Sequence, residues 1–165
     1  MDIKEAFKKA ILGEIEGREL YRAAAEKADD KKAREVFSRL ANEEDSHFKT
    51  LQKLAESYFK GEKLEIPKLK KLETFEDAES PIFSRDFKNF VKDKHFEVST
   101  LAIGMKLELE SSKFYKEMAE AVEKEELKEF FVYLSDWEND HYEALRKQIG
   151  FIEQYYTAQN SLYRF

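Results

Sequence analysis

The sequence predicts an all-α protein, a four-helix bundle made of two helical hairpins. Charged residues make up 39% of the 165 residues and hydrophobic residues 42%, whereas there are only 5 glycines and 2 prolines. This composition is typical of long helices that bury one side and expose the other. The second observation is an internal repeat, because the chain shifted by 94 positions aligns with itself without a gap.

The repeat pairs residues of the same type along each half. Its period is too long for a solenoid and occurs only twice, so it indicates two related hairpins. The aligned pairs include Glu14 with Glu108, Tyr21 with Tyr115, Phe37 with Phe131, Leu40 with Leu134, Glu44 with Glu138, His47 with His141 and Leu51 with Leu145. We therefore expect one domain over residues 1–150, with halves at 1–60 and 97–150 and a crossover at 61–96.

Each half divides at a polar turn into two helices. The turns lie at 28–33 and 122–127, and the expected helices span about 2–28, 31–59, 97–122 and 124–149. Asp2 is the expected N-cap of the first helix, and Ser99 or Thr100 that of the third. Gly61 is expected to end the second helix and Gly150 the fourth, because glycine readily adopts the left-handed conformation that closes a helix.

The crossover of residues 61–96 is too long for a simple turn. If a two-fold axis relates the hairpins, the third helix runs parallel to the second, so the crossover must travel the bundle's full length of about 40 Å. It contains both prolines, and a short helix is expected at 84–93. Its phenylalanines are expected to pack on the bundle or at a subunit contact: Phe75, Phe83, Phe87, Phe90 and Phe96.

The C-terminal tail of residues 151–165 has no counterpart in the repeat. Its aromatic residues suggest a short extension that packs on the bundle or on a partner subunit, and the alternative is a docking element for a redox partner. The net charge of −6 argues against nucleic-acid and anionic-membrane binding. No cysteine is present, which excludes thiolate metal sites and disulfides within the chain. With no apolar run of membrane-spanning length, we expect a cytoplasmic protein.

A carboxylate interrupts the apolar stripe of every predicted helix, and an imidazole also interrupts it in two of the four. At coiled-coil spacing, the inward positions of the four helices include these six residues near their middles: Glu14, Glu44, His47, Glu108, Glu138 and His141. A single Glu-x-x-His pair often arises by chance on a solvent-exposed helix face. Here the pair occurs twice, and each time another glutamate lies 30 residues before the glutamate of the pair. His95, about 20 Å from Glu108 along a helix, is too distant to join them.

Burying these carboxylates without partners would cost several kcal/mol each, and their mutual repulsion would add to that. Two divalent cations would neutralise them, with the histidines completing the ligands, as in dimetal helix bundles. The sequence therefore predicts one buried two-metal site. Tyr21 and Tyr115, each seven residues after a glutamate, are expected to hydrogen-bond to its carboxylates, and the alternative is that they are ordinary core tyrosines.

At these residues the chain resembles the ferritin-like di-iron carboxylate superfamily, and most closely the rubrerythrin group. The resemblance covers roughly 1–60 and 97–150 and implies a ferritin-like antiparallel four-helix bundle that frequently forms a homodimer. It implies two iron ions, with manganese or zinc as substitutes. Glu44 and Glu138 would bridge the ions, Glu14 and Glu108 would be terminal ligands, and each histidine would serve one ion.

Two features depart from the family pattern. Rubrerythrins proper carry a further carboxylate three residues after the helix-3 terminal glutamate, where this chain has Ser111, and the repeat-equivalent residue is Gly17. Glu110 lies about 200° around the helix from Glu108 and cannot substitute. The rubredoxin domain is also missing, so electrons would come from a separate donor such as a rubredoxin-like protein.

The leading functional hypothesis is a non-haem di-iron oxidoreductase that reduces hydrogen peroxide or dioxygen in defence against oxidative stress. One alternative is a ferroxidase or iron-handling protein, which would turn over the iron itself. The other is a structural module that retains a vestigial dimetal site. The sequence leaves the oxidant and the metal open.

Overall fold

The computed structural model describes residues 2–66 and 95–161, which form four long helices. They are α1 (Ile3–Lys27), α2 (Lys31–Lys60), α4 (His95–Ala121) and α5 (Glu125–Ser161). No strand occurs in these two ranges. The all-α prediction is confirmed, and the helix bounds lie close to the expected ones except at two ends.

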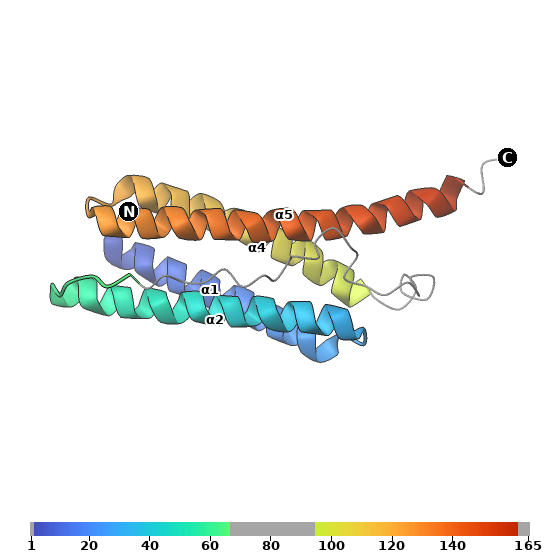
Figure 1. Ribbon diagram of the computed structural model, residues 1–165, viewed down its shortest axis with the longest axis horizontal. Helices are drawn as coiled ribbons and strands as arrows, with labels where there is room; N and C mark the ends of the chain where they lie inside the picture. The colour runs from blue at the N-terminus through green and yellow to red at the C-terminus, as the bar shows by residue number, and fades with distance from the viewer. Residues whose placement is uncertain (1, 67–94, 162–165) are drawn as a thin grey trace.

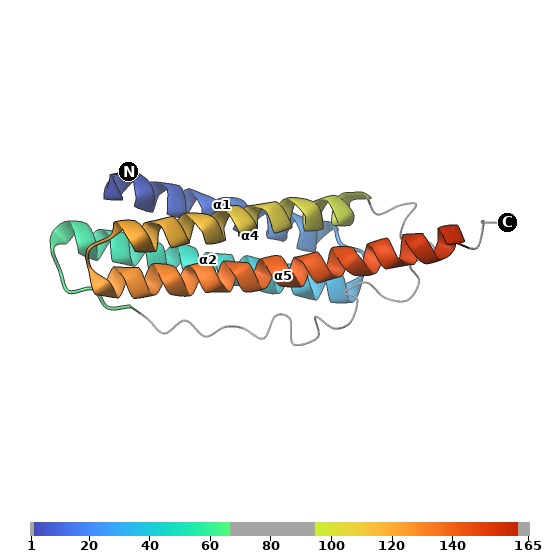
Figure 2. The same ribbon diagram turned by 90° about the horizontal axis from the view of Figure 1, so that it is seen from above.

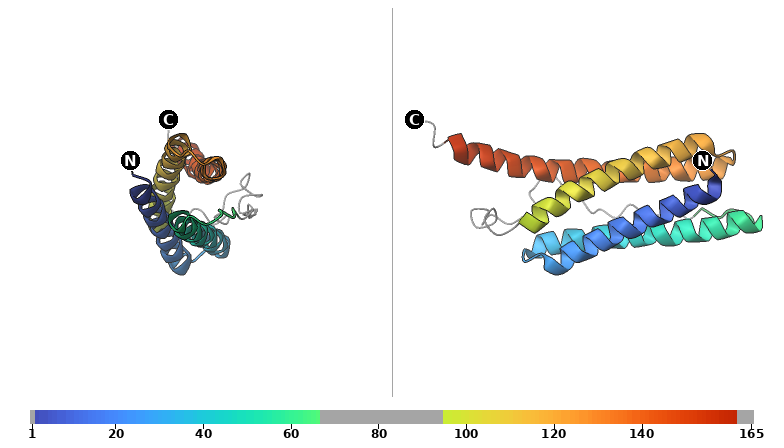
Figure 3. Two further views of the ribbon diagram at one scale, coloured as in Figure 1. Left: turned by 90° about the vertical axis from the view of Figure 1, so that its left-hand side faces the viewer. Right: turned by 180° about the vertical axis from the view of Figure 1, so that it is seen from behind.

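The helices form two antiparallel hairpins, α1 with α2 and α4 with α5 (Figure 1). The hairpins pack together chiefly through α1 and α4, which run in opposite directions (Figure 2). Consequently α4 runs parallel to α2, and the last described residue after α2 lies at the opposite end of the bundle from the start of α4. The end-on view in Figure 3 shows the four helices around a common centre. This is the ferritin-like arrangement with a long crossover.

Helix ends follow local sequence signals in the first hairpin. The Asp2 side chain accepts a hydrogen bond from the Lys4 backbone N–H, and Asp30 accepts from Lys32 and Ala33, so both acidic residues are N-caps. Gly61 has φ 69° and ends α2, as predicted. Such caps satisfy backbone groups that have no partner within the helix.

Two predicted helix ends in the second hairpin are wrong. α4 begins at His95, so Ser99 and Thr100 lie inside the helix and neither is its N-cap. α5 continues through Gly150 to Ser161, so the predicted tail is in large part helical. The buried side chain of Ile152 packs on the same apolar cluster as Leu145. This burial offsets the roughly 1 kcal/mol that glycine costs inside a helix.

Several predictions fall outside the described residues. These are the short helix at 84–93 and the packing of Phe75, Phe83, Phe87 and Phe90, while the side chain of Phe96 is likewise not described. None of the described helices has a stretch long and apolar enough to cross a membrane.

The apolar core consists of two clusters, one toward each end of the bundle. One is built around Tyr21, Phe37 and Leu101, and the other around Phe7, Tyr115 and Phe131. In each cluster a tyrosine stacks on a phenylalanine of its own hairpin, with ring centroids 6.4 Å apart for Tyr21–Phe37 and 6.1 Å apart for Tyr115–Phe131. The polar residues of the predicted site lie between the two clusters.

Gly104 allows α4 to approach Tyr21 on α1. A Cβ at this position would lie 2.8 Å from the Tyr21 hydroxyl oxygen, which is closer than a real Cβ contact. The Tyr21 side chain is completely buried and cannot move away without disturbing its neighbours. Gly150 differs, because nothing lies within 4 Å of a Cβ built there.

Alanine substitutions at these two glycines should have opposite effects on stability. We expect Gly104→Ala to destabilise the fold by about 1–3 kcal/mol, since the added methyl overpacks the core. Gly150→Ala should stabilise it by up to about 1 kcal/mol, because alanine has the higher helix propensity. Chemical denaturation of the metal-free proteins measures both changes. Equal stability of Gly104→Ala and wild type would contradict the close approach.

Candidate metal centre

The six predicted site residues meet at the middle of the bundle. Glu14 lies on α1, Glu44 and His47 on α2, and the other three on α4 and α5: Glu108, Glu138 and His141. Each is at most 3% exposed. Their positions follow from helical spacing, because residues three or four apart share a face and the inward face of every helix points to the same centre.

The six residues form two overlapping groups of candidate ligands. Glu14 and His47 complete one group, and Glu108 and His141 complete the other. Both groups contain Glu44 and Glu138, and the ligand atoms within each group lie within 4.8 Å of one another. One atom from each residue of a group could therefore contact a single ion, with two carboxylates shared between two ions.

The histidines turn the same ring nitrogen toward the carboxylates. His47 Nδ1 lies 3.1 Å from Glu14 Oε2 and 3.1 Å from Glu138 Oε1. His141 Nδ1 lies 3.6 Å from the nearest carboxylate oxygen of each of three glutamates: Glu44, Glu108 and Glu138. The two Nδ1 atoms are thus the imidazole atoms available to ions placed among the carboxylates.

Tyrosine hydroxyls bind the two unshared glutamates across the α1–α4 contact. Tyr21 on α1 donates to Glu108 Oε1 on α4, and Tyr115 on α4 donates to Glu14 Oε1 on α1. Both tyrosines are buried, and each reaches the glutamate of the other half of the repeat. The two hydrogen bonds hold the carboxylates in place and tie the hairpins together.

Two residues next to the site were missed by the sequence analysis. Glu43 is 1% exposed and its Oε2 lies 2.7 Å from His141 Nε2. Trp137 donates its indole N–H to the same oxygen over 3.0 Å. A buried glutamate directly before Glu44 was hidden because the chain is rich in acidic residues. The repeat did contain a signal for these two residues. All aligned pairs with a role in the site consist of identical residues, whereas Glu43 aligns with Trp137.

Burial and mutual repulsion distribute protons unevenly over the glutamates. Burial raises the pKa of Glu14 and that of Glu108 well above the ordinary value, with neighbouring carboxylates adding to it. Burial acts on Glu44 and Glu138 in the same sense. Contacts with the two histidines nevertheless hold the pKa of Glu44 below its usual range. The Glu108 carboxyl, followed by the two histidines, holds the pKa of Glu138 well below its usual range. In the metal-free protein the shared glutamates therefore carry the negative charge.

The histidines respond in the opposite sense. Burial by itself would lower the pKa of His47 and His141, but the facing carboxylates raise it well above the ordinary value. Two imidazolium groups then balance two carboxylates, and protons take the place of cations in the buried cluster. Burial also raises the pKa of Tyr21 and Tyr115 well above their ordinary value, so both hydroxyls remain hydrogen-bond donors.

The donor atoms suit hard or borderline divalent cations. Both oxygens of Glu138 and the Oε1 of Glu44 are buried and make no well-aligned hydrogen bond within the described part of the chain, although Glu138 Oε1 lies 3.1 Å from His47 Nδ1. Such atoms are rare in folded proteins unless they have a ligand. Carboxylate and imidazole ligands without thiolate fit iron or manganese, and the set of four glutamates and two histidines fits two ions that share two bridging carboxylates.

Comparison with known proteins agrees with this geometry. A family model described as Rubrerythrin matches residues 5–149. The chain belongs to the rubrerythrin family. It is therefore a member of a ferritin-like di-iron family, which suggests a two-metal site, and the buried glutamates and histidines are residues that could hold the metal.

A solved structure of a hypothetical protein from Pyrococcus furiosus resembles this rubrerythrin-family chain. The two share 27% sequence identity with a TM-score of 0.69, over 94% of this chain and 92% of that one. A search of curated proteins gives no significant match. The related structure thus supports the fold over nearly the whole chain, and the family model shows the family to which the chain belongs.

The stability of the metal-free protein should fall as the pH rises from about 6.5 to 9. The folded pKa of both histidines lies above the unfolded value near 6.5, so their contribution is full below that pH and is lost as the pH rises through the folded pKa. The raised pKa of Glu14 and Glu108 acts in the same direction. The lowered pKa of Glu44 and Glu138 affects the stability only below about pH 4.3, the unfolded value of a glutamate.

Thermal melting of chelator-treated protein at several pH values measures this dependence. Metal-loaded protein is the control, because its ligands are already deprotonated and its melting temperature should not fall over the same range. A metal-free melting temperature that rises between pH 6.5 and 9 would contradict the assigned protonation.

Metal content should depend on whether a glutamate belongs to one ligand group or to both. We expect about two ions per reconstituted wild-type chain. Glu14→Ala should retain about one, while Glu138→Ala or Glu44→Ala should lose more than one, since each contributes to both groups. Metal analysis after gel filtration measures the ratio, and circular dichroism verifies folding. Equal loss in Glu14→Ala and Glu138→Ala would contradict shared ligation.

Proposed function

We propose that this protein is a non-haem di-iron oxidoreductase that reduces hydrogen peroxide or dioxygen. The observation that carries the proposal is the pair of buried ligand groups that share Glu44 and Glu138. We assign Glu14 and Glu108 as terminal ligands and give one histidine to each ion. Membership of the rubrerythrin family supports iron as the metal.

The bound metal pair would supply two electrons, one from each ferrous ion, to the O–O bond of the oxidant. Reduction of hydrogen peroxide then consumes two electrons and two protons and yields two waters. The protein's own part is to hold the six ligands at the centre of a bundle whose apolar clusters exclude bulk water on both sides. Tyr21 and Tyr115 keep Glu108 and Glu14 oriented.

A groove between α1 and α4 supplies the approach that the proposal assigns to the oxidant. Its volume is about 650 Å³, and Gly13, Ser111 and Tyr115 are among the residues that line it. Tyr115 links it to the centre, because its hydroxyl donates to Glu14. Gly17 is buried beside the centre itself, where a Cβ would lie 3.4 Å from the Glu44 side chain, so a larger residue there would crowd that ligand.

The proposal assigns re-reduction to a separate electron donor. The chain has no cysteine and so cannot hold an iron–sulfur or rubredoxin-type centre of its own. We propose a small redox protein such as a rubredoxin-like carrier, and we expect a homodimer.

The proposal predicts rapid oxidation of the ferrous protein with retention of its iron. Anaerobic protein loaded with two Fe²⁺ per chain should oxidise fully when mixed with hydrogen peroxide or dioxygen in a stopped-flow instrument. A chemical reductant should restore it for many cycles. A centre inert to both oxidants would contradict the oxidoreductase function. Consumption of Fe²⁺ far beyond two per chain, within a large cage assembly, would instead indicate iron storage.

Oxidant preference should depend on the residue at position 111. Rubrerythrins proper carry a carboxylate there, so we expect Ser111→Glu to increase the rate with hydrogen peroxide relative to dioxygen. Ser111→Gln is the matched control, since it has nearly the same size and lacks the charge. The ratio of the two stopped-flow rates is the measurement. The same ratio in both variants would show that the carboxylate does not determine preference.

A further inference from the structure

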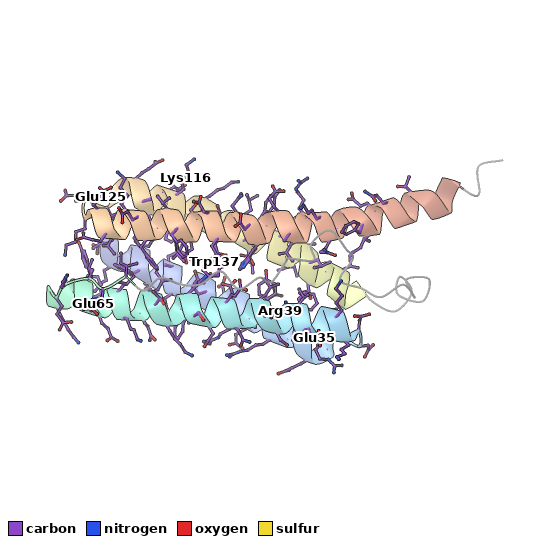
Figure 4. The ribbon with its side chains drawn as sticks, viewed as in Figure 1. Glu35, Arg39, Glu65, Lys116, Glu125 and Trp137 are labelled. Carbon is purple, nitrogen blue, oxygen red and sulfur yellow. The ribbon has the colours of Figure 1, made fainter. Side chains whose placement is uncertain are left out.

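The two halves of the repeat differ at the residue before each shared glutamate. The shift of 94 positions aligns Glu43 with Trp137, although it aligns Glu44 with Glu138 and His47 with His141. Both differing residues are buried, with exposures of 1% and 4%. Trp137 lies on the side of α5 that faces α2 (Figure 4), where the two residues meet. A charged group in one half therefore corresponds to a neutral indole in the other.

Glu43 contacts the edge of the His141 ring that faces away from the centre. The Nδ1 of His141 faces the carboxylates of the centre, and its Nε2 lies 2.7 Å from Glu43 Oε2. When Nδ1 binds an ion, the ring proton is on Nε2 and is donated to Glu43. Trp137 Nε1 lies 3.0 Å from the same oxygen and 2.9 Å from His141 Nε2, and with the ring proton on Nε2 the indole N–H donates to the Glu43 carboxylate. The carboxylate is thus held by two donors, and the imidazole is held by the carboxylate.

His47 lacks this arrangement. Its side chain is completely buried, and its Nε2 makes no hydrogen bond within the described residues. The ring instead packs edge-on against Trp137, with centroids 4.8 Å apart. Trp137 has no acceptor atom to offer, because its indole nitrogen is only a donor. By the internal repeat, residue 137 is the one expected to accept a hydrogen bond from His47. It is a tryptophan and cannot accept one.

We infer that Glu43 makes the two metal positions unequal, so that the Glu108–His141 position binds a divalent cation first and more tightly than the Glu14–His47 position. This inference rests on the proposed two-metal function. A carboxylate hydrogen-bonded to a ligating histidine fixes the ring and strengthens its donor nitrogen, and loss of such a partner typically weakens metal binding about 10- to 100-fold.

Titration of the metal-free protein with Co²⁺ tests the order of binding. Calorimetry and the visible d–d absorption should show two resolved steps in wild type, with about one Co²⁺ per chain in each. Glu43→Gln keeps the size and an acceptor oxygen but removes the charge. We expect it to weaken the first step about 10- to 100-fold and to leave the second within about 3-fold, so that the steps merge.

Asp45→Asn is the matched control. It removes the same charge two residues along α2, but Asp45 pairs with Arg18 at 3.1 Å on the outer side of the helix. Both binding steps of this variant should resemble those of wild type. If Asp45→Asn weakens the first step as much as Glu43→Gln does, the effect is general electrostatics and the inference is overturned.

A second variant tests the assignment without relying on the folding of Glu43→Gln. His47→Ala should lose the weaker step and retain the tighter one with its Co²⁺ spectrum. Loss of the tighter step in His47→Ala would overturn the inference, as would two equal wild-type steps that Glu43→Gln weakens together. Two bound Co²⁺ ions with no inequality would leave the proposed function standing. A wild-type protein that binds no Co²⁺ would overturn both.

Discussion

The structure depends on holding four carboxylates and two imidazoles together at the centre of an apolar bundle. Ions of one sign in a medium of low dielectric repel strongly, and each uncompensated charge costs several kcal/mol. In the metal-free state, protons on the histidines and on Glu14 and Glu108 relieve this repulsion. Divalent cations would relieve it in the metal-bound state. The fold of this chain is therefore coupled to whatever positive charge occupies its centre.

The polar centre of the bundle lies between two apolar regions of the core. Two apolar clusters flank the centre, and each contains one of the tyrosines that reaches across to a glutamate. The same side chains thus fill the core and orient the ligands. Gly104 shows how close the fit is, because Tyr21 occupies the space that any larger residue would need.

Internal duplication explains most of the centre but not all of it. The repeat supplies each half with a glutamate, a tyrosine and a Glu-x-x-His pair, which generates two similar ligand groups. Glu43 and Trp137 break the symmetry immediately behind these ligands and contact each other across α2 and α5. The two ligand groups are nearly identical, but the residues that contact their histidines differ. The metal affinity of one position can therefore change without a change in the other.

Within the described residues, the sequence by itself determined the four long helices, their pairing and the six polar residues at the centre, because helical periodicity and the repeat are local or regular patterns. It did not determine where α5 ends, because burial of Ile152 against a distant cluster outweighs the local signal of Gly150. The pairing of Glu43 with His141 was also decided by tertiary structure. These residues are 98 positions apart, and only the packing of α2 beside α5 brings an otherwise unremarkable glutamate to the imidazole.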